Sequence, residues 1–336
     1  MAVSWRSAAQ DALYGSAGFY VVNRPAAHFR TSVHAAADLF ADAIGELLAR
    51  VDHALERPDP LDLVDVGAGG GELLSALSVP SGMARRLRLT AVERGPRPPG
   101  VGYRWGPEIP PVTGLLVANE WLDNVPVDVA CRDESGADRL VLVSPSGDES
   151  LGDVVSGDDA AWLARWWPLR SPGDRAEIGS ARDAAWAAAA GRVRRGLAVA
   201  VDYGHVAGAR PAGGTLTGYR DGRQVPPVPD GSCDLTAHVA MDSLAPGAVL
   251  RRQRDVLRAL GVSGGLPPRE LASADPARYL RALGSASRAA ELLAPDGLGS
   301  FYWLLGEHGL GRDLDLGLGV PEAANLADRE GRHEPA

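Results

Sequence analysis

A short apolar segment that runs directly into a cluster of glycines constrains this sequence most. Residues 61–66 (LDLVDV) follow two prolines, which break the chain, and they are predicted to form a buried strand. Residues 67–71 (GAGGG) then supply a turn, and a helix is expected from Glu72 onward. Such a turn exposes backbone N–H groups at the positive end of a helix and lets a nucleotide approach closely. The pattern predicts a nucleotide-binding α/β unit.

Three further apolar segments extend this unit into a sheet. Residues 87–93 (LRLTAVE), 114–120 (GLLVANE) and 197–203 (LAVAVDY) each end on an acidic or aromatic polar residue. Residues 35–55 carry apolar side chains at three- and four-residue spacings, which is typical of an amphipathic helix. Strands that alternate with helical segments predict an α/β fold with a mostly parallel, doubly wound, Rossmann-like sheet.

The length of 336 residues suits one large domain with insertions, or two domains. We expect an N-terminal helical segment over 1–60 and the sheet domain over 61–310, with an inserted lid or subdomain at about 130–195. The insertion begins like a hairpin at 139–147. Within and after it the pattern predicts helices over 159–167, 181–193 and 246–260, a last strand near 301–305, and a disordered tail over 311–336.

Four tryptophans belong to the insertion: Trp162, Trp166, Trp167 and Trp186. Trp162 and Trp166 are one helical turn apart and lie on one face. They form either the core of the insertion or a face that docks a partner, because tryptophan is enriched at interface anchors. The sequence leaves both alternatives open.

Composition excludes several chemistries. All 34 basic residues are arginine, so a phosphate loop ending in Gly-Lys-Ser/Thr, a lysine Schiff base and a Ser-Lys pair are ruled out. A net charge of −9 disfavours binding to nucleic acid. We find no apolar run of ~18 residues that could span a membrane, and no secretory h-region, so a cytoplasmic location is expected.

Metal binding is not expected from this sequence. The two cysteines, Cys131 and Cys233, cannot build a disulfide framework or a four-thiolate zinc site. A site made by His205, Cys233 and His238 would need a fourth ligand and has no recognised spacing.

The glycine pattern favours S-adenosylmethionine over a dinucleotide. The dinucleotide fingerprint needs a third glycine at position 72, where this chain has Glu72, so a dehydrogenase is disfavoured. The methionine part of S-adenosylmethionine instead brings an amino acid to the turn. Glu93 ends the next strand, where a carboxylate would accept both ribose hydroxyls. The alternative is a plain strand–helix connection with a surface acid. The residues predicted to bind the cofactor are Gly67, Ala68, Gly69, Gly71, Glu93 and Asn119.

Glu120 ends a predicted strand, and ligands of open α/β sheets bind outside the carboxyl ends of strands. Methyl transfer requires a nucleophile held ~3 Å from the methyl group and an acceptor for its proton. Carboxylates serve both needs when the nucleophile is a guanidinium nitrogen. Asp123 is the second carboxylate of this segment. The alternative is that Glu120 and Asp123 cap the following helix, an interpretation that fits Asp123 better.

Asp202, Tyr203 and His205 close another predicted strand at the same edge, and complete the set of candidate catalytic residues. A tyrosine or histidine there could relay a proton or shape an arginine slot. Alternatively these side chains hold the loops together by hydrogen bonds. For His238 a structural role is expected.

Six motifs, taken in order, resemble the MidA-type class I methyltransferases, relatives of the mitochondrial methyltransferase that assists complex I assembly. They are spread from about residue 14 to residue 305 and comprise 29–32 (FRTS), 66–73 (VGAGGGEL), 117–126 (VANEWLDNVP), 201–205 (VDYGH), 214–216 (GTL) and 234–239 (DLTAHV). The resemblance implies a class I methyltransferase fold and S-adenosylmethionine as cofactor. It also implies, from the characterised mitochondrial relative, symmetric dimethylation of a protein arginine. Gly67, Gly69, Gly71 and Glu93 would bind the cofactor, and Asn119 and Glu120 would line the transfer site.

Two departures from the family pattern affect the region where substrate enters. His34 stands where the family usually has an acid, and residues 217–223 (TGYRDGR) lack the family's usual histidine. We therefore expect an S-adenosylmethionine-dependent methyltransferase of class EC 2.1.1 that acts on a protein, at arginine, and leave its particular target open. A small-molecule acceptor is one alternative, and an assembly factor without turnover is another. No nucleic-acid or membrane partner is expected, and a homodimer is left open.

Overall fold

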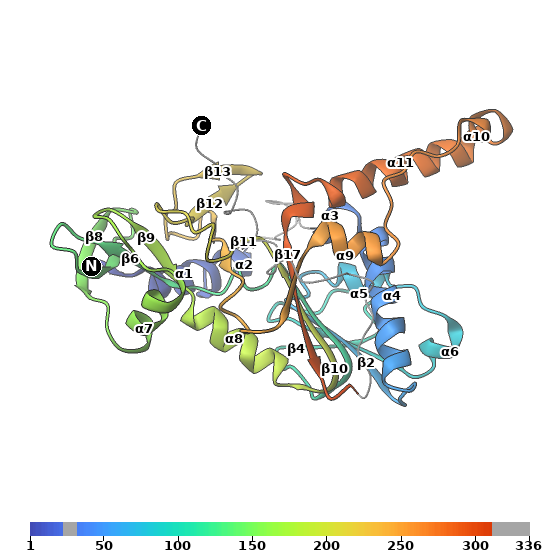
Figure 1. Ribbon diagram of the computed structural model, residues 1–336, viewed down its shortest axis with the longest axis horizontal. Helices are drawn as coiled ribbons and strands as arrows, with labels where there is room; N and C mark the ends of the chain where they lie inside the picture. Colours follow the sequence, from blue (N-terminus) through green and yellow to red (C-terminus); the bar gives the residue numbers. More distant parts are fainter. Residues whose placement is uncertain (23–31, 311–336) are drawn as a thin grey trace, which may run out of the picture.

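The computed structural model describes residues 1–22 and 32–310, and its centre is a seven-stranded sheet. The strands are β2 (Leu61–Val66), β3 (Leu87–Val92), β4 (Arg104–Gly106), β5 (Val112–Asn119), β10 (Val193–Asp202), β16 (Val249–Arg252) and β17 (Tyr302–His308). Their spatial order is β16-β17-β10-β5-β2-β3-β4. Figure 1 shows this sheet near the middle of the molecule. The first strand of this sheet in chain order, β2, lies between β3 and β5, so the strand order reverses there. In open α/β sheets that reversal marks the ligand crevice.

Strand direction in this sheet is mixed. The pairs β3–β4, β2–β3, β2–β5 and β5–β10 are parallel. Strand β17 runs antiparallel to both β10 and β16. The smaller sheets add mainly antiparallel pairs, so the prediction of a mostly parallel sheet does not describe the chain as a whole. The sequence did locate the parallel part, because β2, β5 and β10 are rich in apolar residues and buried along most of their length, as expected when both faces are covered.

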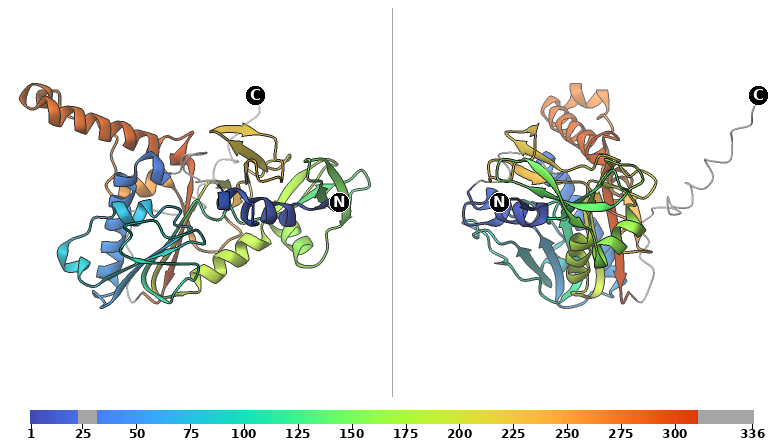
Figure 2. Two further views of the ribbon diagram at one scale, coloured as in Figure 1. Left: turned by 180° about the vertical axis from the view of Figure 1, so that it is seen from behind. Right: turned by 90° about the vertical axis from the view of Figure 1, so that its left-hand side faces the viewer.

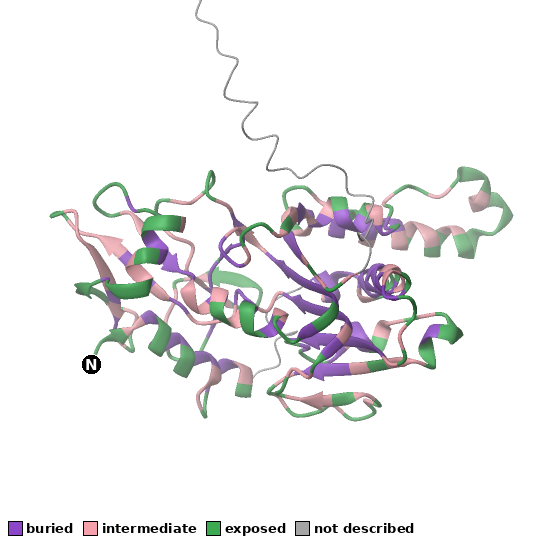
Figure 3. Cartoon of the chain, turned by 60° about the horizontal axis from the view of Figure 1, so that its bottom comes forward, coloured by how far each residue is buried: buried purple, intermediate pink, exposed green. Residues whose placement is uncertain are grey.

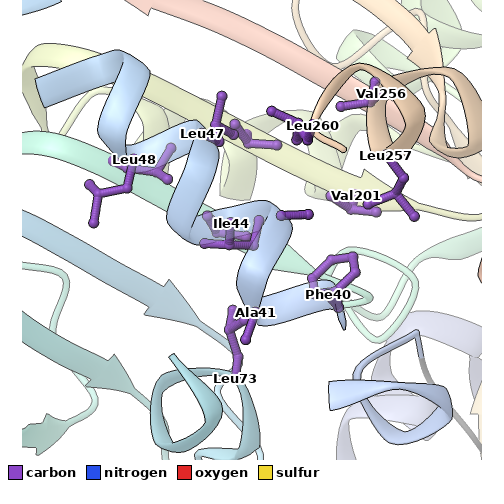
Figure 4. Packing of buried hydrophobic residues seen from close by; sticks show 14 of the residues in the cluster. Phe40, Ala41, Ile44, Leu47, Leu48, Leu73, Val201, Val256, Leu257 and Leu260 are labelled. Carbon is purple, nitrogen blue, oxygen red and sulfur yellow. The ribbon is translucent and has the colours of Figure 1, made fainter. Parts of the chain in front are cut away.

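Helices cover both faces of the central sheet. Helix α4 (Ala37–Ala54) turns Phe40, Ile44 and Leu47 inward at helical spacing, where they belong to one buried cluster with Val201 of β10 (Figure 4). Each large apolar side chain buried in this way contributes about 1.5–3 kcal/mol. The helices on the same face are α5 (Glu72–Ala76), α9 (Gln253–Ala259) and α11 (Pro276–Leu293), and α8 (Ser180–Ala190) covers the other face.

A second lobe is built around an antiparallel sheet (Figure 2). Its strands are β1 (Val3–Ser4), β6 (Asp128–Arg132), β7 (Asp138–Val143), β8 (Glu149–Val154) and β9 (Arg175–Ile178). Successive residues of β6 point to opposite faces: Val129 packs against helix α1 (Trp5–Tyr14), and Ala130 packs with the residues of α7 (Gly157–Trp166). The segment predicted as an insertion thus supplies most of this sheet. Its role as a lid, and the division into domains, remain predictions.

Three of the four tryptophans of that segment are core residues. Trp162 and Trp167 are buried in the lobe, and Trp186 is buried against the central sheet. Trp166 is half-buried, with the guanidinium of Arg165 4.6 Å from the centre of its ring. The structure therefore places Trp162, Trp167 and Trp186 in cores and leaves Trp166 partly open.

The remaining elements are short. They are α2 (Phe19–Val22), α3 (Ser32–Ala35), α6 (Ser81–Ala84), β11 (Gly204–His205), β12 (Thr217–Arg220), β13 (Arg223–Val225), β14 (Asp234–Thr236), β15 (Val239–Ala240), α10 (Arg269–Ala274) and the 3₁₀ turn η2 (Leu298–Ser300). Strand β11 pairs with β15, and β12 pairs with β13 and β14. In the described ranges, no helix is long and apolar enough to cross a membrane.

Two predictions for the C-terminal half need correction. Residues 246–260 form β16 and then α9 rather than one helix, because Val249 and the residues after it pair with β17. Helix α11 was not predicted, and only its second half is buried, while Leu280 is 66% exposed (Figure 3). The predicted tail over 311–336 lies outside the described residues, and so do the first three residues of the FRTS motif.

Candidate active site

The glycine turn adopts the conformation that its sequence predicts. Gly67, Gly69 and Gly71 have φ angles of 75°, 56° and 81°, which side chains other than glycine rarely adopt. A Cβ atom on Gly67 would lie 2.8 Å from Cδ1 of Trp121, and one on Gly71 would collide with the hydroxyl of Tyr103. A Cβ on Gly69 would meet only Glu72 Oε2, at 3.6 Å, so the space over the middle of the turn is open.

Carboxylates surround this turn. Glu93 Oε2 accepts a hydrogen bond from the backbone N–H of Gly69 (3.0 Å), and Glu72 Oε2 accepts one from Gly70 (2.9 Å). Asp65, buried near the end of β2, has its pKa raised to about 7 by burial and by the charges of Glu72 and Glu93. Two of the turn's amides are therefore already bonded to carboxylates, and the local charge is negative. This arrangement repels a pyrophosphate and suits a ligand that carries positive charge.

Glu120 directly follows β5, with a left-handed φ of 50°. Its N–H donates to the carbonyl of Val201 (2.7 Å), and its Oε1 accepts from the N–H of Ser32 (2.7 Å) and from Asn119 Nδ2 (3.3 Å). Burial raises the pKa of Glu120 to about 7, although the Ser32 N–H opposes the shift. The Glu120 carboxyl group can therefore exchange a proton near neutral pH.

Asn119 lies beside this carboxylate as predicted. It is the last residue of β5 and is 9% exposed. Its Oδ1 is buried and has no hydrogen-bond donor among residues 1–22 and 32–310. A buried acceptor without a donor costs free energy, so this atom is a polar group that a ligand or a rearrangement could satisfy.

Asp202, at the end of β10, is the residue that caps the neighbouring loop. Its Oδ2 accepts hydrogen bonds from the backbone N–H groups of Leu122 (3.0 Å) and Asp123 (3.2 Å). The segment after Asp123 is a turn and not a helix, so the alternative that Glu120 and Asp123 cap a helix is wrong. Burial raises the pKa of Asp202 well above its usual range.

Asp123 and Tyr203 form a buried polar cluster next to this loop. Asp123 Oδ2 accepts hydrogen bonds from the hydroxyls of Tyr203 (2.6 Å) and Thr236 (3.1 Å). Burial raises the pKa of Asp123, while the hydrogen bond from Tyr203 opposes the shift. The guanidinium of Arg182 from α8 is 97% buried and donates to the carbonyl of Asp123 (2.6 Å). These contacts fix the loop that follows Glu120.

His205 does not join this group. Strand β10 ends at Asp202, and residues 204–205 leave the central sheet to pair with β15. The His205 ring packs edge-on against Trp167 (4.5 Å between centres), and its Nδ1 lies 2.6 Å from a guanidinium nitrogen of Arg210. Burial and Arg210 lower the pKa of His205 to about 3, which keeps the ring neutral. The predicted relay role of His205 is therefore not supported by its position.

Three further residues of the site escaped sequence reasoning. Asp65 could have been found, because it is an acid in a strand that is otherwise apolar at its carboxyl end. Ser32 acts through its backbone N–H, and Arg182 acts through a buried guanidinium group. Neither contact produces a residue pattern that could be recognised in the sequence. His238 is exposed, and its ring lies edge-on to that of Tyr203 (5.3 Å). In the part of the chain that the structure describes, no group of three His, Cys, Asp or Glu residues could hold a metal ion.

The structure is a Rossmann-like α/β fold with an acid-lined glycine turn where the strand order reverses. Two solved structures from Burkholderia thailandensis share this fold. One, described as a "likely methyl transferase" bound to S-adenosyl-homocysteine, has a TM-score of 0.77 and 21% identity, over 97% of this chain and 92% of that one. The other, a native structure of an uncharacterized protein of the same superfamily, has a TM-score of 0.76 and 23% identity, over 94% and 90%.

A protein-family model also matches part of the sequence. Residues 98–258 match the family described as "Putative S-adenosyl-L-methionine-dependent methyltransferase". This match supports the family resemblance that the motifs predict, and the family description names the predicted cofactor. No protein of curated function matches the chain.

Proposed function

We propose that this protein transfers a methyl group from S-adenosylmethionine to a guanidinium nitrogen of a protein arginine. The observation that carries the proposal is Glu120, a carboxylate with a pKa of about 7 at the end of β5, beside the glycine turn. A cytoplasmic location and a protein partner belong to the same proposal.

The residues at the turn fit the cofactor. The glycines of the turn have left-handed backbone conformations, and the space over Gly69 is open. Together these features leave room for a ligand at the end of β2. Glu72 and Glu93 supply negative charge there, which suits an ammonium and a sulfonium group better than phosphates. When bound, S-adenosylmethionine supplies a methyl group on a positively charged sulfur and leaves as neutral S-adenosylhomocysteine. The solved relative that binds S-adenosyl-homocysteine supports this assignment.

Glu120 would act on the acceptor. A guanidinium stays protonated in water, so its nitrogen must lose a proton as the new carbon–nitrogen bond forms. The Glu120 carboxylate would hold the guanidinium by charge-assisted hydrogen bonds and accept this proton. The Ser32 N–H, 2.7 Å from Oε1, fixes the carboxylate in place. Sulfur keeps the electron pair of the broken sulfur–carbon bond, so charges balance.

The surroundings favour a cation as acceptor. Asp123 and Asp202 lie buried next to Glu120, and their charges interact with it. Among the described residues, Arg182 is the cation that acts on both aspartates, and it bonds to carbonyl oxygens rather than to their carboxylates. Burial therefore raises the pKa of both aspartates and opposes their ionisation. A positively charged side chain would lower the free energy of this group of acids.

Methyl-labelled S-adenosylmethionine tests the proposal. The native protein is incubated with a lysate of its source organism, and labelled products are separated by size and analysed by mass spectrometry. We expect label in a protein band, on arginine, and none with Glu120→Gln. Label confined to small molecules would contradict the protein acceptor, and label on another side chain would contradict arginine.

A further inference from the structure

The side chain of Trp121 packs against the first glycine of the glycine turn. Its side chain lies directly on Gly67, so closely that a Cβ atom there would be 2.8 Å from Cδ1 and 3.2 Å from both Cβ and Cγ of the tryptophan. The ring packs against the apolar core beside the sheet but stays only half-buried. A large aromatic surface therefore lies where the ends of β2 and β5 meet.

Two other aromatic side chains near the turn have a different position. Tyr103 and Trp105 lie at its far end, next to Gly71. The hydroxyl of Tyr103 donates to the carbonyl of Gly71 (3.0 Å), and the indole N–H of Trp105 donates to that of Gly95 (2.9 Å). Tyr103 thus uses its hydroxyl to hold the turn, and Trp105 uses its indole N–H to hold the loop after β3. Trp121 instead follows Glu120 directly in the chain, so it is the aromatic residue nearest in sequence to the proposed reacting centre.

An indole ring is the strongest aromatic partner for a cation, because the face of the ring is negative. A neutral thioether gains only dispersion and weaker sulfur–aromatic contacts from the same surface. An indole at this place would therefore bind the positively charged cofactor more tightly than the neutral product.

We propose that Trp121 distinguishes the sulfonium cofactor from the thioether product, so that the product leaves the site readily. This inference rests on the proposed function. Trp121 is a specificity-determining residue in this account: it lowers the free energy of one ligand relative to the other and takes no part in proton transfer.

Binding measurements test the inference without any turnover. Calorimetry gives dissociation constants for S-adenosylmethionine and S-adenosylhomocysteine with the native protein, Trp121→Phe and Trp121→Leu. We expect Trp121→Leu to reduce the preference for S-adenosylmethionine by roughly 3- to 30-fold, and Trp121→Phe to lie between. Trp166→Leu, which removes a half-buried indole from the other lobe, is the matched control and should keep the native ratio.

Nuclear magnetic resonance on the native protein gives a second, independent readout. The ¹³C-labelled S-methyl group of bound S-adenosylmethionine should resonate upfield of its free position, because it lies in the ring current of Trp121. Trp121→Phe should reduce the shift. An unshifted methyl resonance would overturn the inference, and so would an equal loss of both ligands in Trp121→Leu, which would assign the ring to packing on Gly67. If the native protein binds neither ligand, the proposed function itself fails.

Discussion

The carboxylate of Glu93 lies across the glycine turn, with Oε2 3.0 Å from the backbone nitrogen of Gly69. Its other oxygen, Oε1, accepts from the N–H groups of Arg94 (2.7 Å) and Gly95 (3.0 Å). Three amides from two strand ends thus hold one acid at the place where the sequence predicts ribose binding. This contact joins the ends of β2 and β3 at the switch point, and its negative charge disfavours a pyrophosphate at the turn.

Replacement of Glu120 by glutamine should separate binding from transfer. Glu120→Gln keeps the size of the side chain but cannot accept a proton, so we expect methyl transfer to fall by about 10²- to 10⁴-fold. Affinity for S-adenosylmethionine should stay close to native. Transfer is measured with labelled cofactor and affinity by calorimetry. Glu270→Gln on the exposed helix α10 is the control and should behave like the native protein.

The pH dependence of kcat/KM checks the same role. A base works only when deprotonated, so kcat/KM should rise with pH and level off above about 7, the pKa of Glu120. Equal activity of Glu120→Gln and the native protein across this range would mean that another group accepts the proton.

Asp65 should make stability depend on pH in a defined direction. Its pKa is raised to about 7 in the folded protein, so its neutral form favours folding, and this contribution is lost as pH rises from about 4 to 7. Asp65→Asn does not titrate. Its free energy of unfolding, relative to native, should therefore increase by roughly 1–4 kcal/mol between pH 4 and pH 8. Urea unfolding at several pH values measures the difference, and parallel curves for the two proteins would contradict it.

Asp62→Asn is a useful comparison for that experiment. Asp62 also belongs to β2, but its carboxylate accepts from Arg88 (2.8 and 3.0 Å) and from the N–H of Thr113 (2.8 Å). Loss of these charge-assisted hydrogen bonds should lower stability by about 1.5–3 kcal/mol near neutral pH.

His205→Gln should affect the fold and spare the chemistry. The neutral ring packs on Trp167 and its Nδ1 lies 2.6 Å from Arg210, away from Glu120. We expect a loss of about 1–3 kcal/mol in the free energy of unfolding and an unchanged transfer rate for the folded protein. Thermal unfolding and labelled-methyl transfer measure the two effects. A large loss of transfer with full stability would restore His205 to the catalytic set.

The sequence predicted most reliably the positions of residues at the carboxyl ends of the parallel strands. Gly67, Glu93, Glu120 and Asp202 all end or follow such strands, and carboxyl ends of parallel strands share one edge of the sheet, so their approach could be foreseen. Residues beyond the sheet could not be placed in this way. His205 is only three positions after Asp202, yet the chain turns there and pairs with β15.

Tertiary pairing explains the other differences. Residues 249–252 show a pattern that also suits a helix, and only their pairing with β17 makes them a strand. Similarly, the carboxylate that accepts the N–H groups of Leu122 and Asp123 is that of Asp202, some 80 residues later in the chain. The spacing of residues along the sequence does not predict such a long-range contact.

Binding of S-adenosylmethionine tests the central claim most directly. The native protein and Gly69→Val are titrated calorimetrically with the cofactor. Valine cannot readily adopt the φ of 56° at this position, and its side chain would occupy the open space over the turn. We predict saturable binding by the native protein and a loss of at least about 100-fold in affinity for Gly69→Val, corresponding to about 2.7 kcal/mol. No binding by the native protein, or equal binding by both, would contradict the assignment of the glycine turn.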